Sequence, residues 1–153
     1  MIKNIGIEIP QDVYDILKNE KIIGILTTFS EKGIPYMTPI STIYPKNKES
    51  ILIAILAENI GYKNMVWQKK VTFSLIESNN MCINLVGRSG VVRAPSKTHP
   101  LINIAQIDII DVIQDDSLFV AIESKIKWKH FSPEMKNLHE SLMRELQECA
   151  NVI

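Results

Sequence analysis

The segment best suited to bind an anion runs from Ala57 to Asn64, where an apolar stretch gives way to a short helical pattern. A helix N-terminus presents unpaired backbone N–H groups and a partial positive charge, so it can hold a phosphate. Lys63 would add charge there, and Gly61 would let a ligand approach the backbone. The alternative is that Asn59 caps the helix while Lys63 points into solvent. The spacing leaves both interpretations open, and the cap is the simpler one.

The other reactive residue types form no recognisable catalytic or metal-binding motif. The sequence has no G-x-S-x-G nucleophile motif, no Walker loop and no G-x-G-x-x-G stretch. Its three histidines are His99, His130 and His139, and no pair of them has the spacing of metal ligands. We therefore predict no metal site, and no side chain is identified as the catalytic acid, base or nucleophile.

Most of the segments that would position these residues have a β-like pattern, with β-branched apolar runs bounded by turns. Pro35 and Pro39 lie inside one run, so that strand is expected at a sheet edge, bulged or broken. Gly87 and Gly90 lie inside another run, where glycine marks a bulge or a close approach of another group. The expected strands are 22–29, 34–44, 51–56, 71–77, 81–93, 104–113 and 118–128, with a further extended segment at 5–9.

Three helices are expected. The first begins at Pro10 and runs to about Glu20, and the second, short helix spans 61–70. The third has a clear start signal, with Ser132 as N-cap and Pro133 at the first position. Its apolar face would cover either an open end of a barrel or a partner subunit; that face carries Met135, Leu138, Leu142, Leu146 and Cys149.

Consecutive strands joined by short turns cannot be parallel, because a parallel pair needs a crossover of roughly a dozen residues or more. The pattern therefore predicts a mainly β (α+β) domain: six or seven antiparallel strands that close into a small barrel. The short internal helix would cap one end. At 153 residues, the whole chain 1–153 is expected to form one domain.

The composition narrows the class of partner. Seventeen basic and 17 acidic residues give a formal net charge of +0, which disfavours nucleic acid as a partner. No apolar run is long enough for a signal peptide or a membrane span. Cys82 and Cys149 are far apart and are expected to be free thiols, as in a reducing cytoplasm.

The order and spacing of several motifs resemble the pyridoxamine 5′-phosphate oxidase-like, FMN-binding split-barrel superfamily. The stretch Ile23-Gly24-Ile25-Leu26-Thr27-Thr28, a turn, and Gly33-Ile34-Pro35-Tyr36-Met37-Thr38-Pro39-Ile40 resemble its "G-x-L-A-T … G-x-P-x-x-x-P" opening. Asn64-Met65 and the strand from Val71 resemble its "K-x-x-N-L … V-x-L" continuation, and 86–90 and 122–128 resemble later strands.

This resemblance implies a six-stranded Greek-key split barrel that forms a homodimer and holds FMN at the dimer interface. It places the flavin ring along Thr38, Pro39, Ile40, Ser41 and Thr42. It places the phosphate near Asn59, Gly61, Lys63 and Asn64, and adds Arg88 and Trp128 as further cofactor contacts.

One departure from the family pattern concerns the phosphate. The family's lysine usually precedes the Asn-Leu pair by three or four residues, where this chain has Ile60 and Gly61. Lys63 lies directly before Asn64, and a shift of two residues turns a helical side chain by roughly 200°.

The resemblance implies a flavoprotein, expected to be an oxidoreductase acting on a small molecule that the sequence does not identify. The alternatives are a non-catalytic flavin or haem carrier or sensor on the same barrel, and a dimeric module without a cofactor. In the haem alternative, His99, His130 and His139 would be the candidate contacts.

Overall fold

The computed structural model of the chain describes residues 2–19 and 21–152. Over these residues it contains eight strands and three helices, and every strand pair is antiparallel. The mainly β, antiparallel prediction is therefore confirmed. The elements are β1 (Ile2–Gly6), α1 (Gln11–Asn19), β2 (Gly24–Phe29), β3 (Pro35–Ile40), β4 (Ile43–Asn47), β5 (Ser50–Leu56), α2 (Ile60–Trp67), β6 (Lys70–Glu77), β7 (Met81–Arg93), β8 (Ile102–Asp115) and α3 (Pro133–Ala150).

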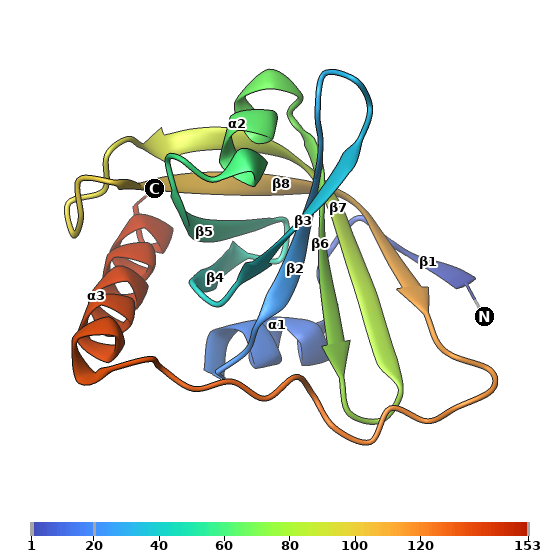
Figure 1. Cartoon of the computed structure of the whole chain (residues 1–153). Helices are drawn as coiled ribbons and strands as arrows, with labels where there is room; N and C mark the ends of the chain where they lie inside the picture. The colour runs from blue at the N-terminus through green and yellow to red at the C-terminus, as the bar shows by residue number, and fades with distance from the viewer. Residues whose placement is uncertain (1, 20, 153) are drawn as a thin grey trace.

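The strands form one strongly curved sheet, in the order β3-β2-β6-β7-β8-β5-β4, with β1 added beside β8. The first and last strands of this order, β3 and β4, are joined in the chain by only Ser41 and Thr42. The sheet must therefore curl until its two ends meet, which makes a barrel (Figure 1). As predicted, β3 is an edge strand, and the chain leaves it directly after Pro39 and Ile40.

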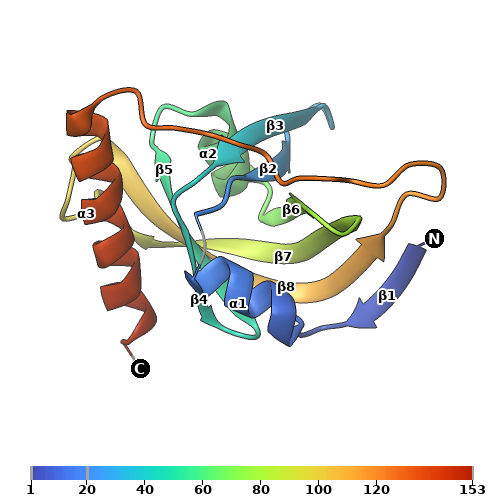
Figure 2. The same ribbon diagram turned by 90° about the horizontal axis from the view of Figure 1, so that it is seen from below.

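The predicted strand 118–128 is wrong. Residues 116–131 are irregular and form a strap that crosses one end of the barrel, from the end of β8 to the start of α3 (Figure 2). A strand needs a free sheet edge. However, β7 lies on one side of β8, while β5 and β1 share the other. The residues that follow β8 therefore cannot pair with β8 as a further strand.

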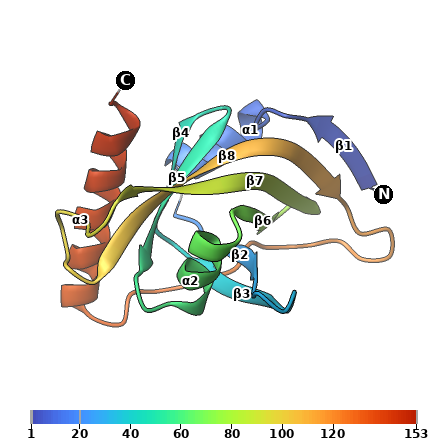
Figure 3. The ribbon, with the colours of Figure 1, turned by 90° about the horizontal axis from the view of Figure 1, so that it is seen from above.

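The strand β5 is buried on both faces, which accounts for its uninterrupted apolar sequence. Ile51, Ile53 and Ile55 face the barrel interior, in the same cluster as Phe73. Leu52 and Ala54 face outward and are covered by α3 through Leu142, Leu146 and Cys149. Thus α3 packs on its own sheet, against an outer face rather than an open barrel end (Figure 3). Met135 of its predicted apolar face stays exposed.

The remaining helices begin close to their predicted positions. Helix α1 starts at Gln11, one residue after Pro10, whose carbonyl accepts a hydrogen bond from Tyr14 N–H. Its predicted end at Glu20 lies outside the described residues. Helix α2 follows β5 and packs on β2, β7 and β3, at the end of the barrel opposite the strap (Figure 1).

Candidate functional site

The start of α2 is fastened to β3 through one side chain. Asn59 is the N-cap of α2, and its Oδ1 accepts a hydrogen bond from the Gly61 N–H at 2.7 Å. The same oxygen accepts a bond from the Thr38 hydroxyl at 3.3 Å. The structure thus brings Thr38 of β3 to Asn59 and Gly61, which both lie at the start of α2.

Only glycine fits at position 61, because no side chain has room there. A Cβ atom on this residue would lie 2.7 Å from Thr38 Oγ1 and 2.8 Å from Asn59 Oδ1, closer than real Cβ atoms approach. The residue is buried, and its role is to let α2 lie against β3. The sequence interpretation assigned this space to an approaching ligand, whereas in the structure Thr38 and Asn59 occupy it.

Lys63 and Asn64 have other partners. Lys63 is exposed and its Nζ lies 3.1 Å from Glu58 Oε2. Asn64 is buried, and its Nδ2 donates to Thr28 Oγ1 at 3.2 Å, which anchors α2 on β2. The capping alternative is therefore the arrangement seen in the structure.

The five residues predicted to face the flavin ring, 38–42, lie in different surroundings. Pro39 is exposed, whereas Ile40 belongs to the buried core. The Thr42 hydroxyl donates to the Ala54 carbonyl at 2.7 Å and so joins β4 to β5. The Ser41 carbonyl lies 3.1 Å from His139 Nε2, at the end of the barrel where α3 and the strap meet.

A cavity of about 180 Å³ lies between α2 and the sheet, and the sequence did not single out most of its residues. Ser89 is buried at its base, where its N–H and its hydroxyl both donate to the Lys69 carbonyl. The neighbouring Arg88 is exposed. The sequence signals for this cavity were Met65, in the Asn64-Met65 motif, and the 86–90 stretch with Gly90. Its lining includes Tyr62, Met65, Val66, Lys69, Gly90 and Val91.

The two glycines of β7 have different roles. A Cβ on Gly87 would lie 2.5 Å from the Asp108 carbonyl oxygen, and the register between β7 and β8 shifts at this residue. Gly87 therefore marks both a bulge and a close approach, as predicted. Gly90 has open space around it, which is the space of the cavity.

Apolar side chains are exposed on the elements around this cavity. They come from the end of β5, from α2 and from the end of β7, and each is between 46% and 62% exposed. We call this set the α2 patch; it consists of Leu56, Ile60, Val66, Trp67, Val91 and Val92. Clustered exposed apolar residues of this kind mark interaction surfaces more often than isolated ones do.

Trp128 lies elsewhere, in a cluster of three rings. Its ring centroid is 5.1 Å from that of His130 and 5.4 Å from that of His139, and the two histidine rings are 5.1 Å apart. Burial lowers the pKa of His139, and the positive charges of His130 and Lys21 act in the same direction. The Ser41 carbonyl opposes this lowering. Trp128 therefore shares a site with Ser41 and not with Asn59.

No group of three or more His, Cys, Asp or Glu side chains in the described part of the chain could hold a metal ion. Within the same residues, no helix has both the length and the apolar character to cross a membrane. Cys82 and Cys149 are unpaired, and His99 Nδ1 accepts a local bond from the Leu101 N–H.

Comparison with known proteins finds similarity in structure but not in sequence. No protein-family sequence model matches the chain, and no curated protein sequence matches it. Three solved structures illustrate the likeness of fold, and their sequence identities to the chain are 13%, 11% and 18%.

The first is a Lactobacillus delbrueckii protein that carries the name pyridoxamine 5′-phosphate oxidase. It matches with a TM-score of 0.63, over 72% of this chain and 98% of its own. HupZ from Group A Streptococcus matches with a TM-score of 0.61, over 78% of this chain and 99% of its own. An FMN-binding protein from Syntrophomonas wolfei matches with a TM-score of 0.57, over 69% and 85%. The chain therefore has the split-barrel fold of these proteins, as its motifs predicted.

Proposed function

We propose that this protein binds FMN and is an oxidoreductase that acts on a small molecule. The observation that carries the proposal is the fold: nearly the whole length of several split-barrel proteins matches this chain, and one of them is named for FMN binding. Fold alone does not assign chemistry. The proposal therefore also depends on the junction of Thr38, Asn59 and Gly61, which lies where the motifs place the cofactor phosphate.

In the proposed complex, the phosphate lies at the N-terminus of α2 and the flavin ring follows β3 beside Thr38 and Pro39. The Thr38 hydroxyl can turn from Asn59 to the phosphate, because its present bond is long at 3.3 Å. Lys63 can also turn, because its partner Glu58 is exposed and such surface pairs contribute only about 0–1 kcal/mol. In this complex Lys63 contacts the phosphate, although it lies two or three residues from the position of the family's lysine.

We also propose that the site is completed by a second copy of the chain. The cavity beside α2 holds about 180 Å³, whereas sites for small molecules and cofactors usually enclose roughly 300–1,000 Å³. Two residues of the α2 patch, Val66 and Val91, border this cavity, and the patch would be buried in a homodimer. Arg88, exposed beside the buried Ser89, is a candidate to reach the cofactor of the partner subunit.

The flavin would supply the hydride or electron transfer itself. The role of this chain is to bind and orient it: the α2 N-terminus holds the anion, β3 supports the ring, and the α2 patch keeps water from the interface. No described side chain at the site acts as a necessary proton donor. This suits chemistry carried by a cofactor.

The first experiment is to purify the protein, record its visible spectrum and titrate it with FMN. We expect a protein that is yellow as purified, or one that is colourless but binds added FMN as a dimer. The FMN-loaded protein should then oxidise NADH or NADPH. A protein that takes up no FMN would overturn the proposal. Flavin uptake without any turnover of nicotinamide or other donors would instead indicate a carrier.

The position of the phosphate is tested by Asn59→Asp. Aspartate caps a helix as well as asparagine does, so α2 should stay folded, but its charge would repel a phosphate. We expect FMN affinity to fall about tenfold or more, while the melting temperature stays constant or rises. Asn47→Asp is the matched control, because Asn47 also caps a turn through its Oδ1, between β4 and β5. Equal FMN affinity in both variants would show that the phosphate lies elsewhere.

A further inference from the structure

A second pocket lies under the strap, at the end of the barrel away from α2. Its volume is about 460 Å³, within the range of small-molecule sites. It is bordered by Lys21, between α1 and β2, and by the strap residues 125–130. Strand β2 separates the two sites: it begins at Gly24, close to Lys21, and at its other end Thr28 contacts Asn64 of α2.

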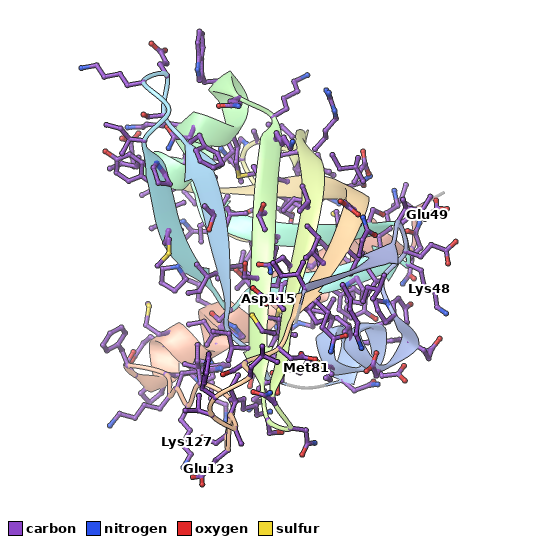
Figure 4. All side chains as sticks on the ribbon, turned by 90° about the vertical axis from the view of Figure 1, so that its right-hand side faces the viewer. Lys48, Glu49, Met81, Asp115, Glu123 and Lys127 are labelled. Carbon is purple, nitrogen blue, oxygen red and sulfur yellow. The ribbon has the colours of Figure 1, made fainter. Side chains whose placement is uncertain are left out.

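The pocket concentrates positive charge in a protein without net charge. Of the described residues that border it, four are lysines, Lys21, Lys125, Lys127 and Lys129, and none carries a carboxylate. Lys125 has a partner of its own, so the excess charge is that of Lys21, Lys127 and Lys129. Gathering ammonium groups around one cavity costs electrostatic free energy, and a bound anion would relieve it. Two carboxylates, Glu77 and Glu123, border a neighbouring cavity, which Lys125 also borders. Figure 4 shows Glu123 and Lys127 at this end of the molecule, below Met81.

The strap also supplies an apolar wall and an unused hydrogen-bonding atom. In a regular strand, Lys125, Lys127 and Lys129 would point to one face, and Ile126, Trp128 and His130 to the other. Because the strap is irregular, both sets border the pocket. The Nε2 atom of His130 is buried and has no hydrogen-bond partner among the described residues. Buried polar atoms are seldom left so, and an acceptor bound nearby would satisfy it.

We propose that this pocket binds a small organic anion, in which a phosphate or carboxylate group is attached to an aromatic body. The ammonium groups of Lys21, Lys127 and Lys129 hold the acidic group. The wall formed by Ile126 and Trp128 contacts the ring, which explains why an aromatic side chain stands among the lysines. The site does not depend on flavin binding at α2.

The experiment is calorimetric titration of the full chain with three probes: AMP, inorganic phosphate and adenosine. AMP carries both the anionic group and the ring, whereas each of the other probes carries one of them. We expect AMP to bind most tightly and to weaken at high salt. Phosphate binding as tightly as AMP would overturn the aromatic part of the proposal, and no AMP binding at millimolar concentration would overturn all of it.

Charge-reversal variants locate the site. Lys21→Glu and the double variant Lys127→Glu/Lys129→Glu change different segments, and each should weaken AMP binding about tenfold or more. Lys48→Glu, in the exposed turn between β4 and β5, is the matched control and should bind AMP normally (Figure 4). Equal loss in the control would mean that only the overall charge matters, which contradicts a local site. The Asn59→Asp variant should also bind AMP normally; loss of binding there would move the ligand to α2.

Discussion

At the scale of single residues, Gly24 lies directly against the ring of Phe73. A Cβ on Gly24 would lie 2.6 and 2.7 Å from the two Cε atoms of the Phe73 ring, and nearer still to its Cζ. Phe73 is fully buried in the central cluster, so its ring has no empty space to enter. The glycine at the start of β2 is therefore a requirement of the core.

This contact predicts that Gly24→Ala destabilises the protein. Overpacking a filled core usually costs about 1–3 kcal/mol, and we expect about 2 kcal/mol here. The measurement is urea unfolding at neutral pH. Phe73→Leu supplies the control, because a smaller side chain should accept the added methyl group. In the double variant, Gly24→Ala should then cost much less; an equal cost in both backgrounds would show that the ring is not the obstacle.

The sequence predicts the role of a residue when that role depends only on its neighbours in the chain. The turn Ser30-Glu31-Lys32-Gly33 predicts a positive φ at its glycine, and the φ of Gly33 is +76°. Gly24 belongs to a motif and Gly61 was a candidate phosphate neighbour, but the side chains that require glycine there, Phe73 and Thr38, lie on other elements. Such requirements depend on contacts that one sequence does not reveal.

At the scale of elements, Glu145 of α3 holds the connection between β7 and β8. Its carboxylate is almost fully buried and accepts bonds from Arg93 Nη1, from the Lys97 and Thr98 N–H groups and from the Thr98 hydroxyl. Burial by itself would raise the pKa of Glu145, but these bonds outweigh it and lower the pKa to about 2. The ionised carboxylate therefore fastens the loop to the helix.

The pKa of Glu145 gives a stability prediction with a definite pH range. Because the folded pKa lies below the unfolded value of 4.5, the stabilisation is complete above about pH 5 and is lost as the pH falls toward 2. We expect Glu145→Gln to cost about 2 kcal/mol at pH 7, since buried donors lose their charged acceptor. The difference in unfolding free energy between variant and wild type should shrink below pH 4.5.

The control for this prediction is Glu140→Gln on the same helix. Glu140 is exposed and its Oε1 lies 3.9 Å from Lys136 Nζ, so its loss should change stability by less than about 1 kcal/mol. If both variants were equally stable at every pH, the buried carboxylate would not hold the loop.

A sequence pattern is sufficient to predict where a helix begins, but not whether a strand forms. Ser132 and Pro133 predicted the start of α3, and the Ser132 hydroxyl does accept a bond from the Met135 N–H. These signals are local. The strand predicted at 118–128 had a suitable pattern, but strand formation also requires a free neighbour, and that depends on the whole sheet. The burial of Glu145 within a helix of mostly exposed charges had no sequence signal.

At the scale of the whole molecule, the proposed homodimer is tested by Val92→Glu in the α2 patch. A charge within an apolar interface should convert the dimer into a monomer and remove FMN uptake with it. The measurement is light scattering coupled to size-exclusion chromatography. Ile7→Glu is the control, because Ile7 is also exposed but lies outside the patch. A dimer that persists in Val92→Glu would place the interface elsewhere.

The strand β1 covers an edge that no other strand reaches. β5 pairs with β8 from Ile102 to Asp108, and β1 pairs with it from Val112 to Asp115. β1 has an open outer edge of its own, but it is only five residues long and its register with β8 shifts between Asn4 and Gly6. Without it, the last residues of β8 would present a regular row of unpaired N–H and C=O groups, and a regular edge pairs with other molecules more readily than a short, bulged one. A variant lacking Ile2–Gly6 is therefore expected to aggregate in a concentration-dependent way, as followed by turbidity and thioflavin fluorescence. A clear solution at concentrations where the full chain is also clear would contradict this. The short strand β1 is thus expected to limit self-assembly of the protein, although its own side chains contribute nothing to the core.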